Sequence, residues 1–90
     1  MEELEDLNAI ERSILLSCCD ANKFSLGSHV PIEAIKRKTK INPKDVKRIL
    51  KTLVSNCFIS KHPTRGAMTY QLTKKGMIAG NQILNRGKKY

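Results

Sequence analysis

Lysines and arginines are the residues of this sequence with the clearest chemical potential, and they are most concentrated between positions 36 and 51. Eight of the chain's 17 basic residues fall in this stretch. Lysine supplies a compact positive charge, and arginine a planar fork that donates two parallel hydrogen bonds. A duplex nucleic acid presents phosphates along its backbone and guanine acceptors in its major groove. The stretch therefore points first to a nucleic-acid interface.

Residues 43–56 are predicted to form an amphipathic helix with its charges along one side. Asn42 can cap it, Pro43 suits its first position, and Asp45 follows in the first turn. At about 100° per residue, the apolar positions fall within about 80° of Val46. They are Ile49, Leu50, Leu53, Val54 and Cys57. The side chains expected to bind DNA lie away from them, and are Lys44, Lys47, Arg48, Lys51, Thr52 and Ser55. Because no glutamate is interspersed to form i,i+4 pairs, we favour a binding surface over a merely solvated face.

Two further basic groups flank this helix. The preceding helix and turn contribute Lys40, next to the run Lys36, Arg37 and Lys38, and these are expected to lie toward the nucleic-acid backbone. CFISKHP (57–63) and AMTYQLT (67–73) are strand-like runs around a Thr-Arg-Gly turn and predict a β-hairpin. Its candidate contacts with a minor groove or its phosphates are Lys61, His62 and Arg65.

The elements that must position these residues are mostly helical. A first helix is predicted from Glu2 to about Cys19, and its inward stripe is Leu4, Leu7, Ile10, Ile14, Leu15 and Cys18. A loop with a short extended piece at 28–30 follows, and Pro31 is expected to open a short helix with Ile32 and Ile35 inward. The last predicted helix, TKKGMIAGNQIL, contains two glycines that either allow close packing or leave the helix frayed.

This order of helix, short strand, helix, helix, strand, strand, helix resembles the winged-helix fold over roughly residues 5–85. The pieces that carry the resemblance are NPKDVKRILKTLVSNCFISK (42–61) and YQLTKKG (70–76). Both look like small MarR- or PadR-type transcriptional regulators, of the kind common in archaea and their viruses. The resemblance implies an α+β fold in which the third helix is the recognition helix and the hairpin is the wing. We expect one domain at residues 1–86 and a basic tail at 87–90.

Composition narrows the possible functions. Residues 1–20 carry a net charge of −5 and residues 21–90 one of +14, which together make the +9 of the chain. Because no apolar run approaches the roughly 18 residues of a membrane helix and the N-terminus is acidic, we expect a cytoplasmic protein, on the nucleoid when bound to DNA. Three cysteines make a poor disulfide framework and are expected to be small buried hydrophobes. The spacing of cysteines, histidines and acids predicts no metal site, cofactor or catalytic centre.

The leading hypothesis is a DNA-binding transcriptional regulator that acts as a homodimer, with no evident small-molecule effector. Candidate dimer contacts lie on the first and last helices, and are Leu4, Leu16, Met77, Gly80 and Leu84. The alternative is a winged-helix module that binds protein within a transcription or replication assembly. RNA binding is a weaker rival, because the chain has few aromatic residues to stack unpaired bases.

Overall fold

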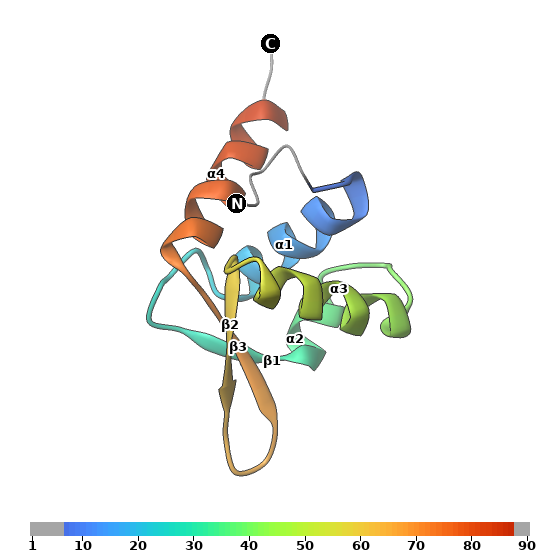
Figure 1. Ribbon diagram of the computed structural model, residues 1–90, viewed down its shortest axis with the longest axis vertical. Coiled ribbons are helices and arrows are strands. Elements are labelled where there is room, and N and C mark those ends of the chain that lie inside the picture. Colours follow the sequence, from blue (N-terminus) through green and yellow to red (C-terminus); the bar gives the residue numbers. More distant parts are fainter. Residues whose placement is uncertain (1–6, 88–90) are drawn as a thin grey trace.

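The computed structural model describes residues 7–87, which form four helices and three strands in the predicted order (Figure 1). They are α1 (Ala9–Ala21), β1 (His29–Pro31), α2 (Ile32–Lys36), α3 (Pro43–Ser55), β2 (Ile59–Pro63), β3 (Met68–Leu72) and α4 (Lys74–Gly87). The strands make one antiparallel sheet in the order β1-β3-β2. The hairpin of β2, β3 and their turn, here called the wing, projects away from the helices. The predicted α+β winged-helix fold is confirmed.

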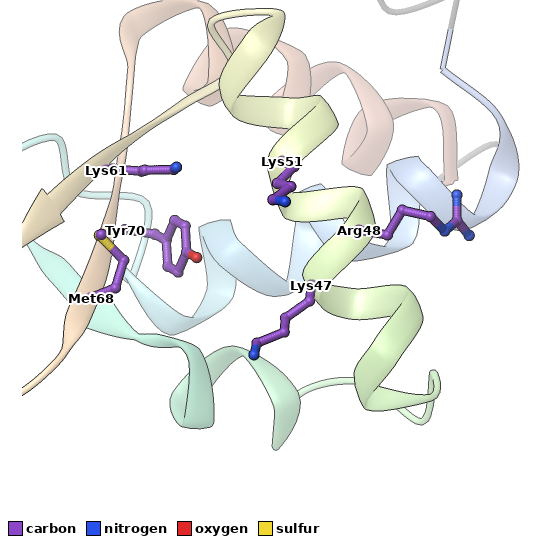
Figure 2. Close-up of a pocket in the computed structure, with 6 residues that line it drawn as sticks. All are labelled: Lys47, Arg48, Lys51, Lys61, Met68 and Tyr70. Carbon is purple, nitrogen blue, oxygen red and sulfur yellow. The ribbon is translucent and has the colours of Figure 1, made fainter.

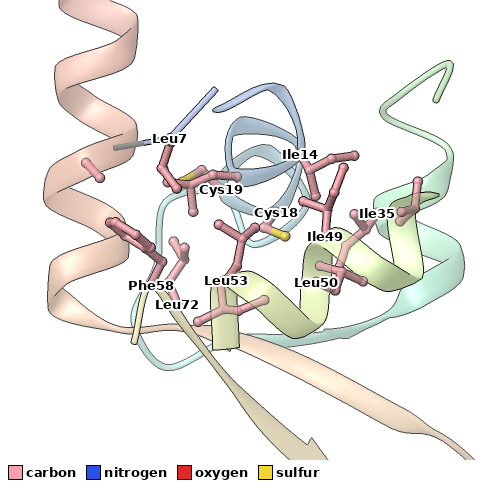
Figure 3. Close-up of a cluster of buried hydrophobic side chains, with 14 residues drawn as sticks. Leu7, Ile14, Cys18, Cys19, Ile35, Ile49, Leu50, Leu53, Phe58 and Leu72 are labelled. Carbon is pink, nitrogen blue, oxygen red and sulfur yellow. The ribbon is translucent and has the colours of Figure 1, made fainter. Parts of the chain in front are cut away.

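The core lies among α1, α2 and α3 and reaches the root of the wing (Figure 3). Its side chains are mostly aliphatic, and Phe58 is its large aromatic member. The apolar stripe predicted for α3 is buried, because Val46, Ile49, Leu50 and Leu53 are each at most 2% exposed. Burial of this stripe determines the rotation of α3 about its axis and leaves its basic side outside.

The first helix begins later than predicted. Asn8 caps α1 through a capping box, in which Asn8 Oδ1 accepts from Glu11 N at 2.8 Å and Glu11 Oε1 accepts from Asn8 N at 2.9 Å. The predicted start at Glu2 is therefore wrong as a continuous helix, since Asn8 is extended and residues 1–6 lie outside the described part. Ile10, placed on the inward stripe, is 51% exposed, whereas Leu7 is buried just before the helix.

Pro31 is part of the sheet and does not open α2 as predicted. It ends β1, opposite Thr69, and its φ of −73° and ψ of 162° are extended. The helix begins one residue later, at Ile32. The two residues predicted to face inward do so, because Ile35 is fully buried and Ile32 is half-buried.

Both ends of α3 are capped by hydrogen bonds. At its start, Asn42 Oδ1 accepts a hydrogen bond from Lys44 N at 2.8 Å, as the sequence predicts for a cap. At its end, Cys57 takes a left-handed φ of 66°, and the N–H groups of Cys57 and Phe58 donate to Val54 and Leu53 at 3.0 Å each. Cys57 is consequently exposed, so the prediction that it is a small buried hydrophobe is wrong, whereas Cys18 and Cys19 are buried as predicted.

The glycines of α4 are sites of close packing. A Cβ on Gly76 would stand 1.8 Å from the carbonyl oxygen of Phe58, and one on Gly80 would stand 2.4 Å from Cys19 Sγ. Of the two alternatives left open by the sequence, close packing is therefore correct. None of the helices described within residues 7–87 is both long and apolar enough to cross a membrane.

Candidate nucleic-acid interface

The exposed side of α3 carries the predicted basic residues. Lys44, Lys47, Arg48, Lys51 and Ser55 are all exposed, opposite the buried stripe. Thr52 differs from them: it is half-buried, and its hydroxyl donates to the carbonyl oxygen of Arg48 at 3.4 Å. Its side chain is thus bonded within its own helix. Lys40 is exposed in the turn that precedes α3.

Little negative charge balances this side of α3. Arg48 Nη2 lies 3.4 Å from Asp45 Oδ1, and both side chains are more than half exposed. Solvent screens such a pair strongly, so Arg48 remains able to exchange partners. Lys47 and Lys51 have no acidic partner within residues 7–87.

An open groove of about 420 Å³ separates α3 from the wing (Figure 2). Its lining residues are Lys47, Arg48, Lys51, Lys61, Met68 and Tyr70. Lys47 and Lys51 extend from α3 toward the wing, and Lys61 and the Tyr70 hydroxyl extend toward α3. The guanidinium of Arg48 points away from the wing. The tertiary structure therefore brings together charges that lie up to fourteen residues apart in the sequence.

Met68 and Tyr70 were not among the predicted site residues. The period-two alternation of AMTYQLT places both on the same face of β3, and the antiparallel register sets Tyr70 opposite Lys61. The alternation was visible in the sequence, but the face toward α3 follows only from the packing of the sheet. The pKa of the Tyr70 hydroxyl is raised, mainly by burial and secondarily by the nearby Cys18 thiol, so it stays protonated as a donor.

The three predicted wing residues do not share one face. His62 follows Lys61 in β2 and therefore points to the opposite side of the sheet. There its ring lies 4.3 Å from the ring of His29, centroid to centroid, and Thr69 Oγ1 is 3.2 Å from His29 Nδ1. Arg65 is exposed in the turn at the tip. The alternation therefore places Lys61 and His62 on opposite faces of the wing, and contact of either residue with DNA stays a prediction.

The predicted dimer residues differ in their surroundings. Leu16 and Leu84 are half-buried and line the same open cavity of about 430 Å³, beside the Lys38–Asp20 ion pair. Met77 is half-buried against the core. Gly80 is buried against Cys19, so its surface is used within this chain. Leu4 lies outside the described residues.

The buried cysteines are unreactive in character. Burial raises the pKa of the Cys18 thiol far above its ordinary value, with a further contribution from Cys19. Burial also raises the pKa of Cys19 to about 12. Both thiols are therefore protonated at neutral pH and act as small hydrophobes, as predicted. Among residues 7–87, no group of three or more His, Cys, Asp or Glu side chains is arranged to hold a metal ion.

An exposed basic helix beside a hairpin, on a core of packed helices, defines a winged-helix fold. No protein-family model and no curated protein matches the sequence. Several solved structures match its fold, and the resemblance predicted from the sequence is confirmed at that level.

Three of these structures illustrate the likeness. The reduced form of MarR from E. coli superposes with a TM-score of 0.77 at 19% identity, covering 94% of this chain and 61% of that one. An archaeal protein reported as a mechanosensitive channel, and described as a structural homolog of MarR-like transcriptional regulators, gives 0.76 at 27% identity, covering 96% and 67%. AF1382 from Archaeoglobus fulgidus gives 0.70 at 20% identity, covering 99% and 100%. The match covers 53% of the chain in the oxidized MarR structure and 61% in the reduced one. This chain therefore spans between half and two thirds of the length of those proteins.

Proposed function

We propose that this protein is a DNA-binding transcriptional regulator that places α3 in the major groove and its wing on the adjacent backbone or minor groove. The observation that carries the proposal is the exposed side of α3, whose four basic residues are turned outward by the buried apolar stripe. A helix of about 10–12 Å diameter fits the B-DNA major groove, which is about 12 Å wide. The likeness to MarR-like regulators supports the same function.

Within this proposal, neighbouring residues have different roles. Arg48 points away from the wing, and its planar fork can donate to O6 and N7 of a guanine. Lys44, Lys47 and Lys51 neutralise phosphates as point charges. Ser55 at the end of α3 and Lys40 in the turn before it are both exposed and can add hydrogen bonds to the DNA backbone. The protein is non-enzymatic in this role.

We further propose that the regulator binds as a homodimer. Two half-sites about one helical turn apart multiply the modest contacts of one small domain. Leu16 of α1 and Leu84 of α4 border one cavity and offer an apolar surface for a second copy. Met77 lies partly exposed on α4.

The decisive experiment combines selection of duplexes from a random pool with a charge-removing variant. We expect a palindromic consensus, and binding that weakens steeply as salt is raised. Lys47→Ala combined with Arg48→Ala should lower the affinity for the selected duplex about 10- to 100-fold, measured by fluorescence anisotropy.

A matched control removes two charges elsewhere. Lys23 and Lys74 are exposed and lie outside the groove between α3 and the wing. Lys23→Ala with Lys74→Ala should leave the affinity within about threefold of the parent, since general electrostatic attraction falls off within a Debye length. If the α3 variant binds as tightly as the parent, or if no duplex is enriched, the protein-interaction module replaces this proposal.

A further inference from the structure

The ring of Tyr70 is packed within the fold, whereas its hydroxyl makes no hydrogen bond to the described residues. Its ring packs against the hydrophobic core from the central strand β3. Its hydroxyl, however, extends toward α3 and has no hydrogen-bond partner within the described residues (Figure 2). A protonated phenol held in one orientation at the edge of a groove is a ready donor, because its ring has already lost its conformational freedom.

The groups around this donor are cations without counter-ions. Lys47, Lys51 and Lys61 line the same groove, and none has an acidic partner among residues 7–87. The acid nearest in sequence, Asp45, lies beside Arg48. Like charges gathered around a half-buried donor repel one another, and an anion placed among them relieves that repulsion. The chemistry of this groove therefore selects an anionic acceptor.

The path of DNA between the two elements identifies that acceptor. A helix in the major groove and a hairpin at the adjacent minor groove are separated by one sugar-phosphate strand, so this strand must cross the space between α3 and the wing. A phosphodiester has two non-bridging oxygens that can accept from ammonium groups and a phenol together. Met68 is 39% exposed on the same wall and offers an apolar contact for a deoxyribose.

We propose that the groove between α3 and the wing holds one phosphodiester of the DNA backbone, with the Tyr70 hydroxyl donating to a non-bridging oxygen. The inference rests on the proposed function and adds Tyr70 as the residue that sets the position of the strand. Lys47 and Lys51 approach this phosphate from α3, and Lys61 approaches it from the wing.

The test is Tyr70→Phe, combined with duplexes in which one phosphate at a time is replaced by a neutral methylphosphonate. Because the Tyr70 hydroxyl has no partner in the described chain, its removal should leave thermal unfolding unchanged. Affinity for the selected duplex should fall about 10- to 100-fold, as for a lost hydrogen bond to a charged acceptor. The loss should be similar for duplexes of other sequence, because phosphates carry no base information.

The site is identified by non-additivity. At one phosphate in each half-site, the methylphosphonate should lower the DNA affinity of the parent protein. It should lower the affinity of Tyr70→Phe much less, because both changes remove the same hydrogen bond. Lys61→Ala should lower the salt slope by about one, whereas Tyr70→Phe should not change it, because a phenol releases no counter-ion.

Two results would overturn the inference while the proposed function stands: Tyr70→Phe binds like the parent, or its loss adds fully to the methylphosphonate loss at every position. If Lys47→Ala with Arg48→Ala also binds like the parent, the proposed function fails with it.

Discussion

Lys61 and His62 illustrate how a single residue step changes what a side chain can reach. Lys61 stands opposite Tyr70 in the register and faces the groove, whereas His62 stands opposite Thr69 and faces the other side of the sheet. Thr69 also donates its hydroxyl to the carbonyl oxygen of His62, which holds the backbone of the wing together at this point. Two neighbouring residues of similar chemistry are therefore not equivalent.

Alanine substitution of Lys61 and of His62 should have different effects on DNA affinity. Lys61→Ala should weaken DNA binding about 3- to 10-fold, because one phosphate contact is lost. His62→Ala should change the affinity by less than about twofold, because its ring packs on His29 away from the groove. Fluorescence anisotropy on one duplex checks both, and equal losses would show that the wing presents its other face to DNA.

At the scale of elements, α4 is held against the rest of the molecule through its glycines. Gly76 N donates to Thr73 Oγ1 at 3.0 Å, and the same Thr73 hydroxyl donates to the backbone carbonyl oxygen of Cys57 at 2.5 Å. These bonds connect the start of α4 to the start of the wing. Lys75 Nζ donates a hydrogen bond to the backbone carbonyl oxygen of Asn56 at 2.9 Å and lies 4.5 Å from the Phe58 ring centroid. The end of α3, the root of the wing and the start of α4 thus form one joint.

Gly76→Ala should destabilise this joint. The new Cβ would overlap the Phe58 carbonyl, so we expect a loss of at least about 2 kcal/mol in the free energy of unfolding, although alanine intrinsically favours a helix by about 1 kcal/mol. Gly27→Ala is the matched control, because a Cβ there meets nothing within 4 Å. Urea denaturation measures both, and equal stabilities for the two variants would contradict the close packing of α4.

At the scale of the whole molecule, charge and apolar surface are separated. The basic groove lies between α3 and the wing, whereas the other cavity is lined mainly by α1, including Leu16, with Leu84 contributed by α4. A dimer formed at that cavity would leave α3 of each copy free. Two copies could then present two recognition helices to one duplex.

Leu84→Glu should test this arrangement, because a charge at an apolar contact is costly to bury. Sedimentation velocity at micromolar concentration should show a dimer for the parent and a monomer for Leu84→Glu. Gln82→Glu adds the same charge at an exposed position of α4 and should remain dimeric. A monomeric parent, or a dimeric Leu84→Glu, would contradict a dimer built on this surface.

Local chemistry alone determined the order of the elements and the rotation of α3. The Asn42 cap and the apolar stripe act within a few residues, so they could be read before any tertiary contact was known. The same reasoning missed the start of α1 at Ala9, where the capping box of Asn8 and Glu11 interrupts an apparently continuous apolar period. It also misplaced Cys57, because α3 ends at Ser55 and the chain leaves the helix direction at Cys57 itself, through its left-handed φ.

Only the tertiary structure decided which side chains meet in the groove. Tyr70 and Met68 face α3 because the sheet packs with that side toward the core, and His62 is turned away by the strict alternation of a strand. Gly80 looked like part of an interface, but its missing side chain accommodates Cys19 of the same chain. The sequence by itself thus determined that the protein presents a basic helix and a hairpin. Strand register and helix packing decided which faces they turn to each other, because those depend on contacts between residues far apart in the chain.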